Sequence, residues 1–133
     1  MKLVLDASVA IAAVRSQEPH HARSRALVDR VLRGEDDIVV PALFCIEVVA
    51  GLVRRGHDDD AAERFAGELV AAPAETVTIG ARRATSIARY AGRARLRAAD
   101  ACYAWIASRR NLALVTLDDE IIRRGLGIVV RLP

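Results

Sequence analysis

The segment KLVLDASVAIAAV, residues 2–14, joins a strand-like run to a helix-like run through a single carboxylate, Asp6. Residues 2–5 are short and aliphatic after the lysine, which is typical of a buried strand, and residues 7–15 have the apolar, alanine-rich composition of a packed helix. A buried carboxylate is costly unless it is paired, protonated or bound to a metal ion. Asp6 therefore requires either a structural or a functional explanation.

The composition describes a small protein with one core. The chain has 133 residues and is 53% hydrophobic, so we expect a single domain spanning residues 1–133. No apolar run reaches the roughly 18 residues of a membrane span, and Asp6 interrupts any signal-peptide core, so we expect a cytoplasmic protein. Cys45 and Cys102 lie in apolar helical stretches and are expected to be reduced core thiols.

Strand-like and helix-like segments alternate along the whole chain. The predicted strands are 2–5, 38–40, 76–79, 112–116 and 128–132, and the predicted helices are 7–15, 20–33, 42–55, 58–71, 80–94 and 98–110. Strands that are separated by helices require crossover connections, which produce a parallel sheet with helices on both faces. The expected fold class is therefore α/β with a mainly parallel central sheet.

Four acidic residues are predicted to meet at one edge of this sheet. Asp6 and Asp118 each follow a predicted strand, and the carboxyl ends of parallel strands form the edge where such sheets bind ligands. Crossover helices run antiparallel to the strands and begin at the same edge. Asp100 lies in the first turn of helix 98–110, and Glu47 lies one to two turns into helix 42–55. All four carboxylates should therefore converge.

Helix capping is the alternative explanation for three of these acids. Asp6, Asp100 and Asp118 all stand where an acid stabilises a helix N-terminus, and the sequence leaves this alternative open. Glu47 does not fit it, because the residues three and four positions away on either side are all uncharged. Asp100 is likewise the only charged residue between positions 98 and 108.

Gathering several carboxylates has an electrostatic consequence. Two ionised groups about 5 Å apart repel by roughly 3 kcal/mol at an effective dielectric constant near 20, which raises their pKa values unless a cation is present. A divalent ion removes this conflict. Ligands that offer only oxygen favour a hard ion, so the sequence predicts Mg²⁺, with Mn²⁺ as a substitute.

A basic segment precedes Asp100. Between positions 76 and 99 there is no acid, and the segment holds six arginines: Arg82, Arg83, Arg89, Arg93, Arg95 and Arg97. Such a segment creates a local positive field that favours phosphate groups. A solvated helix face is the plainer interpretation, but the position of Arg97 three residues before Asp100 favours a polyanionic substrate.

Four segments of the chain resemble the sequence blocks of PIN-domain ribonucleases, in particular VapC-like toxins of type II toxin–antitoxin systems. They are LVLDASV, PALFCIEV, LRAADACYAWIA and LALVTLDDEI, and their order and spacing span the chain. The resemblance implies a Rossmann-like three-layer α/β/α sandwich and a Mg²⁺-dependent endoribonuclease. It also implies an RNA substrate, often tRNA in the family, a small cognate antitoxin and a homodimer.

The resemblance assigns roles to individual residues. The acidic quartet of the family, which is catalytic and binds the metal, corresponds by position to Asp6, Glu47, Asp100 and Asp118. Ser8 and Thr116 match the small hydroxyl residues near the metal, and Asp118 is preferred to Asp119 because it stands two residues after Thr116. The basic segment, and not the resemblance, supplies the candidates for contact with RNA phosphates, which are Arg93, Arg95 and Arg97.

Metal-assisted hydrolysis of a phosphodiester bond is the implied reaction, with Asp6 and Asp100 as the main ligands. The alternative function is a catalytically idle PIN-like module that binds RNA or protein. Loss of one acid would favour it, and all four are present.

Two further predictions concern the helices between residues 20 and 71. The apolar faces of ALVDRVL and FAGELV are predicted to exceed the needs of the core and to bind the antitoxin or a second copy. The consecutive acids Asp58, Asp59 and Asp60 are predicted to point about 100° apart and to cap helix 58–71.

Overall fold

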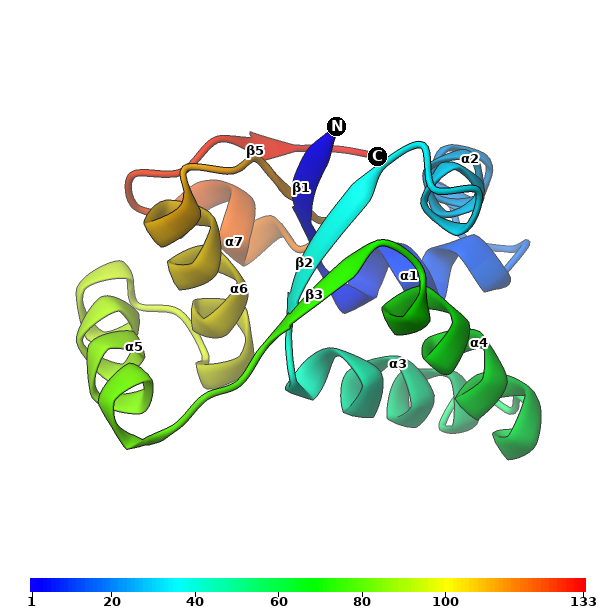
Figure 1. Ribbon diagram of the computed structural model, residues 1–133, viewed down its shortest axis with the longest axis horizontal. Helices are drawn as coiled ribbons and strands as arrows, with labels where there is room; N and C mark the ends of the chain where they lie inside the picture. Colours follow the sequence, from blue (N-terminus) through cyan, green and yellow to red (C-terminus); the bar gives the residue numbers. More distant parts are fainter.

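A computed structural model describes all of residues 1–133 and contains five strands and seven helices (Figure 1). The strands are β1 (Lys2–Leu5), β2 (Asp37–Pro41), β3 (Ala74–Val77), β4 (Leu114–Val115) and β5 (Val130–Arg131). The helices are α1 (Ala7–Val14), α2 (His21–Leu32), α3 (Leu43–Val53), α4 (Asp59–Ala71), α5 (Ala81–Ala94), α6 (Ala98–Arg110) and α7 (Asp119–Arg124).

The sheet is parallel throughout, with the strand order β3-β2-β1-β4-β5. The central strand β1 pairs with β2 on one side and with β4 on the other, and its residues 3–5 are fully buried. Burial on both faces explains why this strand is a continuous apolar run without alternation. Because every strand points the same way, all five carboxyl ends lie at one edge of the sheet.

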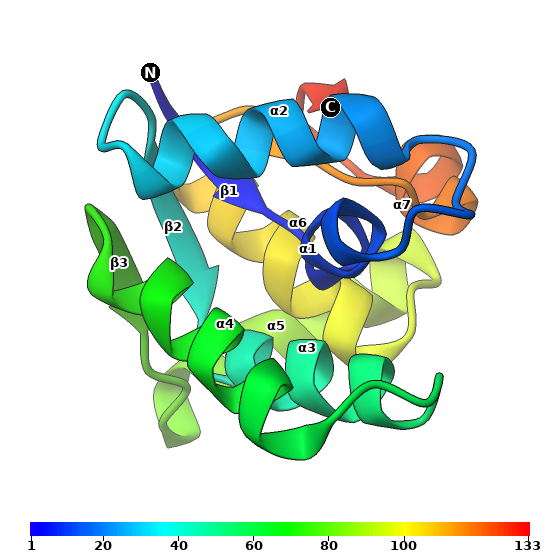
Figure 2. The same cartoon turned by 90° about the vertical axis from the view of Figure 1, so that its right-hand side faces the viewer.

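Helices cover both faces of the sheet. Helices α1 to α4 lie on one side of the strands in Figure 1, and α5, α6 and α7 lie on the other. Figure 2 shows the first group in front, with α6 crossing behind the strands. The two largest fully buried side chains, Tyr103 of α6 and Phe44 of α3, belong to the core between these layers. The predicted three-layer α/β/α fold is confirmed.

The start of β3 is set by pairing rather than by propensity. β1 spans the predicted residues, but β3 begins two residues before the predicted strand 76–79. The carbonyl of Pro73 accepts the amide of Ile38, so pairing with β2 fixes where β3 starts. α7 was not predicted, because six residues are too few to show a helical period.

The predicted apolar surplus on α2 and α4 is wrong. Leu27, Val28 and Val31 of α2 are buried, and so are Ala66 and Leu69 of α4, so the core uses most of both faces. The most exposed large apolar side chain is instead on α3, where Ile46 is 69% exposed.

Both cysteines are free thiols. None of the helices combines the length and the apolar character that crossing a bilayer requires.

Candidate functional site

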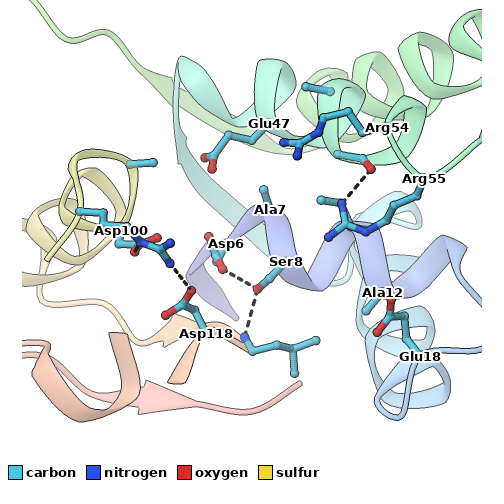
Figure 3. Close-up of a pocket in the computed structure, with 16 residues that line it drawn as sticks. Asp6, Ala7, Ser8, Ala12, Glu18, Glu47, Arg54, Arg55, Asp100 and Asp118 are labelled. Carbon is cyan, nitrogen blue, oxygen red and sulfur yellow. Dashed lines mark hydrogen bonds and ion pairs between the residues drawn. The ribbon is translucent and has the colours of Figure 1, made fainter. Parts of the chain in front are cut away.

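A cavity of about 650 Å³ opens at the carboxyl edge of the sheet, and all four predicted acids line it (Figure 3). Asp6 stands between β1 and α1, Glu47 comes from α3, Asp100 from the first turn of α6, and Asp118 directly precedes α7. Ser8 of α1 lines the same cavity. The direction of the strands and helices alone had predicted this convergence.

Asp6 is almost fully buried, with 5% of its surface exposed. It occupies the N-cap position of α1, yet its side chain makes no capping hydrogen bond. Its Oδ2 instead accepts hydrogen bonds from Ser8 Oγ at 2.5 Å and Thr116 Oγ1 at 2.8 Å. Burial raises the pKa of Asp6, and the two hydroxyl donors oppose this shift. The capping alternative is therefore wrong for Asp6.

The two hydroxyls also fix the segment that carries Asp118. Ser8 Oγ accepts the amide of Leu117 at 3.1 Å, and Thr116 Oγ1 accepts the amide of Asp118 at 3.0 Å. Each hydroxyl thus donates to Asp6 and accepts from the chain after β4. Residues more than a hundred positions apart are held in one hydrogen-bonded network, which sets the position of Asp118 relative to Asp6.

Glu47 is half-buried and is held by a tyrosine that the sequence reasoning missed. Tyr103 Oη donates to Glu47 Oε1 at 2.7 Å, and the Tyr103 side chain is fully buried. Burial raises the pKa of Glu47. The charges of Asp6 and Asp100 raise this pKa further, and the hydrogen bond from the tyrosine hydroxyl lowers it. The signal that could have found Tyr103 is its spacing, because it stands one helical turn after Asp100 and so shares its face of α6.

Arg97 lies against the other two acids. Its Nε is 3.3 Å from Asp100 Oδ2, and its Nη2 is 3.5 Å from Asp118 Oδ2. Burial and the neighbouring Asp118 raise the pKa of Asp100, whereas Arg97 lowers it. The arginine side chain is 72% exposed, so water screens both contacts strongly.

Capping explains one oxygen of Asp118. Its Oδ1 accepts the amides of Glu120 at 2.8 Å and Ile121 at 3.1 Å, which begins α7. Its other oxygen, Oδ2, is the atom that faces Arg97. Asp119 is exposed and does not line the cavity. The geometry thus favours Asp118 over Asp119 as the fourth acid, while showing that Asp118 also has a structural role.

Only one of the three predicted RNA-contacting arginines lines the cavity. Arg97 does, while Arg93 in the last turn of α5 and Arg95 just after that helix are exposed outside the cavity. Two arginines that the sequence reasoning missed, Arg54 and Arg55, extend from the end of α3 towards the same hollow (Figure 3). The sequence feature that could have found these two arginines is again their spacing, since they follow Glu47 by about two helical turns and so share its face of the helix.

The oxygen-only donor set fits a hard, partly hydrated ion. No three of the four carboxylates bring ligand oxygens within 4.8 Å of one another. Opposite ligands of Mg²⁺ stand only about 4.2 Å apart, given bonds of about 2.1 Å. In this arrangement at most two of the acids could bind one ion directly, and the others would act through water, as is usual for Mg²⁺.

The one compact group of three acids lies elsewhere. Oxygens of Asp58, Asp59 and Asp60 are within 4.8 Å of one another on the surface. The predicted separation of these side chains is wrong. Asp58 has an extended backbone before α4, and its side chain turns back over the first turn of the helix. It accepts the amide of Ala61 at 2.9 Å, so the predicted capping is confirmed.

Comparison with known proteins decides the family. The profile of the PIN domain matches residues 3–125. The chain belongs to the PIN domain family. The resemblance seen in the sequence is thereby confirmed. No curated protein sequence is a significant match to this PIN-domain chain.

Solved structures share the fold. VapC20 of Mycobacterium tuberculosis, described as a sarcin-ricin loop cleaving toxin, superposes with a TM-score of 0.74 at 13% identity, covering 96% of this chain and 98% of that one. PAE2754 of Pyrobaculum aerophilum superposes with a TM-score of 0.69 at 22% identity, covering 98% of this chain and 83% of that one. VapBC2 of Rickettsia felis, bound to a DNA fragment from its promoter, superposes with a TM-score of 0.66 at 15% identity, covering 100% of this chain and 99% of that one. At these identities the likeness shows a common fold.

Proposed function

We propose that this PIN-domain protein is a Mg²⁺-dependent endoribonuclease, with Mn²⁺ as a substitute, and the toxin of a toxin–antitoxin pair in the cytoplasm. One observation carries the proposal: four carboxylates from four distant segments of a PIN domain line a single cavity at the carboxyl edge of the sheet. Burial and mutual repulsion raise the pKa values of Asp6, Glu47 and Asp100, so the site is unfavourable without a cation.

Each acid has a distinct part in this proposal. Asp6 and Asp100 are the main ligands, and Glu47 and Asp118 complete the site through water. A bound divalent ion supplies Lewis acidity, which activates water and offsets negative charge on the phosphate. Ser8 and Thr116 hold Asp6 in place, and Tyr103 does the same for Glu47.

The cavity offers cations for the phosphates on either side of the bond that is cut. Arg54, Arg55 and Arg97 line it together with the acids. Glu18 lines it as well, but Arg15 pairs with this carboxylate at 2.9 Å and offsets its charge. Contacts of arginine with phosphate position a nucleic acid without reading its sequence. These contacts suit any nucleic acid, and the choice of RNA as the substrate class, with tRNA as one candidate, rests on the resemblance to PIN-domain ribonucleases.

The proposed partners are an antitoxin and a second copy of the chain. Several structures with this fold are described as VapBC or FitAB assemblies, which supports a small protein partner. The exposed Ile46 and Val53 stand two turns apart on α3 and offer an apolar surface for such a partner. Light scattering that shows only monomers at micromolar concentration would refute the homodimer.

One contact favours the idle module as a second candidate function. Arg97 bridges Asp100 and Asp118, and a cation supplied by the chain itself is an alternative way to offset the charge of an acidic site. In that case the protein would bind RNA or protein without hydrolysis, and it would gain no stability from a divalent ion.

Incubation of the purified protein with labelled total RNA distinguishes the two functions. The wild type and Asp119→Asn, whose side chain lies outside the cavity, should cleave RNA in Mg²⁺ and not in EDTA. Asp6→Asn, Asp100→Asn and Asp118→Asn should cleave little or none. Cleavage that persists in EDTA and in Asp6→Asn would refute the mechanism, and no cleavage by any form would favour the idle module.

A further inference from the structure

A second, smaller cavity lies between the end of β3, the first turn of α5 and the last turns of α6, elements that lie close together in Figure 1. Its volume is about 260 Å³, and it is lined by Val77, Arg83, Trp105, Ile106, Arg109 and Arg110. None of these residues lines the acidic cavity. Half of the lining side chains are therefore cationic, and one of the others is the single tryptophan of the chain.

The positive charge of this second cavity is only partly neutralised. Arg110 pairs with Glu75, but the same carboxylate also pairs with Lys2 at 3.2 Å. Arg83 donates to the carbonyl of Thr78 at 2.7 Å, a contact that orients the guanidinium and leaves its charge uncompensated. Arg109 is exposed and forms neither an ion pair nor a side-chain hydrogen bond. The cavity thus presents surplus cations to an anionic ligand.

Trp105 gives the cavity a fixed aromatic wall. The residue is partly buried, and its ring packs against the hydrophobic core, which limits its motion. Trp105 and Arg109 stand four residues apart on α6, so they occupy the same face of the helix. An aromatic ring beside guanidinium groups is the combination that stacks a nucleobase and binds its phosphate.

The second cavity is separate from the acidic site. Trp105 follows Asp100 by five residues, which corresponds to about 7.5 Å along α6 and about 140° around its axis. The cavity is somewhat smaller than the roughly 300–1,000 Å³ of typical small-molecule pockets, which suits one unit of a longer chain. A duplex would hide the face of each base, whereas a single strand exposes it for stacking.

We propose that this cavity binds one nucleotide of single-stranded nucleic acid, with the base stacked on Trp105 and the phosphate on Arg83 and Arg109. The choice of nucleic acid over another planar anion rests on the proposed function. An acidic peptide would satisfy the arginines but would make no use of the aromatic wall. In the proposed nuclease, the cavity would hold RNA at a second point away from the bond that is cut.

Intrinsic fluorescence tests the site directly, because Trp105 is the only tryptophan. The protein is titrated in EDTA with single-stranded oligouridine of about ten nucleotides, and binding should quench the emission saturably. Arg109→Ala should weaken this binding about fivefold and reduce the slope of log affinity against log salt concentration by about 0.7. Arg64→Ala removes an exposed arginine of α4 outside both cavities and serves as the matched control.

A second readout uses a labelled oligonucleotide and fluorescence anisotropy. Trp105→Leu should weaken binding by about 5-fold to 160-fold, the range for loss of one stacked base. The arginine variants preserve the test if this core variant does not fold. Quenching should persist in Asp6→Asn, whatever the outcome of the RNA cleavage assay, so the two proposals fail independently.

Three results would overturn the inference. Binding seen by anisotropy without any quenching would place the nucleic acid elsewhere. An equal loss in Arg109→Ala and Arg64→Ala would show that only net charge matters. Emission of Trp105 that changes with protein concentration in the absence of oligonucleotide would show that a second copy of the chain covers the cavity.

Discussion

Replacing Tyr103 with phenylalanine tests whether the buried tyrosine holds Glu47 at the site. The substitution keeps the ring in the core and removes only the hydroxyl that donates to Glu47 Oε1 at 2.7 Å. A hydrogen bond to a charged group contributes about 1.5–3 kcal/mol, and we take the lower part of this range, about 1.5–2 kcal/mol, because Glu47 is only half-buried. Unfolding entropy near 2.1 cal/mol/K per residue gives roughly 0.28 kcal/mol/K for 133 residues. Tm should therefore fall by about 5–7 °C.

Thermal unfolding followed by circular dichroism in EDTA at neutral pH measures this loss. The same substitution in a Glu47→Gln background is the control, because the hydroxyl then bonds a neutral amide and its loss should cost about 1 kcal/mol less. A fall in Tm below about 1 °C, or an equal fall in both backgrounds, would show that the hydroxyl does not hold an ionised Glu47.

Three further predictions concern the charges of the acidic site. The raised pKa of Asp100 means that the folded state releases this proton at higher pH than the unfolded state, so the group stabilises the fold most below about pH 4 and loses that contribution as pH rises through its folded pKa. Asp100→Asn should therefore be as stable as the metal-free wild type or slightly more stable at neutral pH, with any gain vanishing near pH 4, and a large loss in urea unfolding would instead support a capping role. Thr116→Val should destabilise the metal-free protein by about 2 kcal/mol, because buried Asp6 loses a hydrogen-bond donor. The control, Thr85→Val on the exposed face of α5, should change stability by less than about 0.5 kcal/mol. Similar losses in the two variants would contradict this role of Thr116. Mn²⁺ at about a hundred times its Kd should stabilise the wild type by about 2.7 kcal/mol, with the shift retained in Asp119→Asn and reduced in Asp118→Asn, and no shift in the wild type would count against a metal site.

The parts of the site that follow from chain direction could be predicted from the sequence. Asp6 comes directly after β1, Asp118 follows β4 by three residues, and Asp100 lies in the first turn of a helix, so a parallel sheet alone places them at one edge. The polarity of each element is visible in the order of its residues. No packing detail is needed for this step.

The parts that depend on how helices rotate against one another could not be predicted. The bond from Tyr103 to Glu47 requires a particular rotation of α6 relative to α3, and the approach of Arg54 to the cavity requires the same of the end of α3. The start of β3 depends on its partner strand, where Pro73 accepts the amide of Ile38. Interactions between elements determine these features, and the local sequence does not predict them.

The hydroxyl network around Asp6 has a consequence for the timing of synthesis. Ser8 and Asp6 emerge early from the ribosome, but Thr116 and the amide of Leu117 are translated near the end of the chain. A nascent polypeptide that ends before β4 holds Asp6 without its second donor, Thr116, and lacks Asp118 altogether. The complete acidic site of the proposed nuclease therefore cannot form before translation has passed the fourth strand.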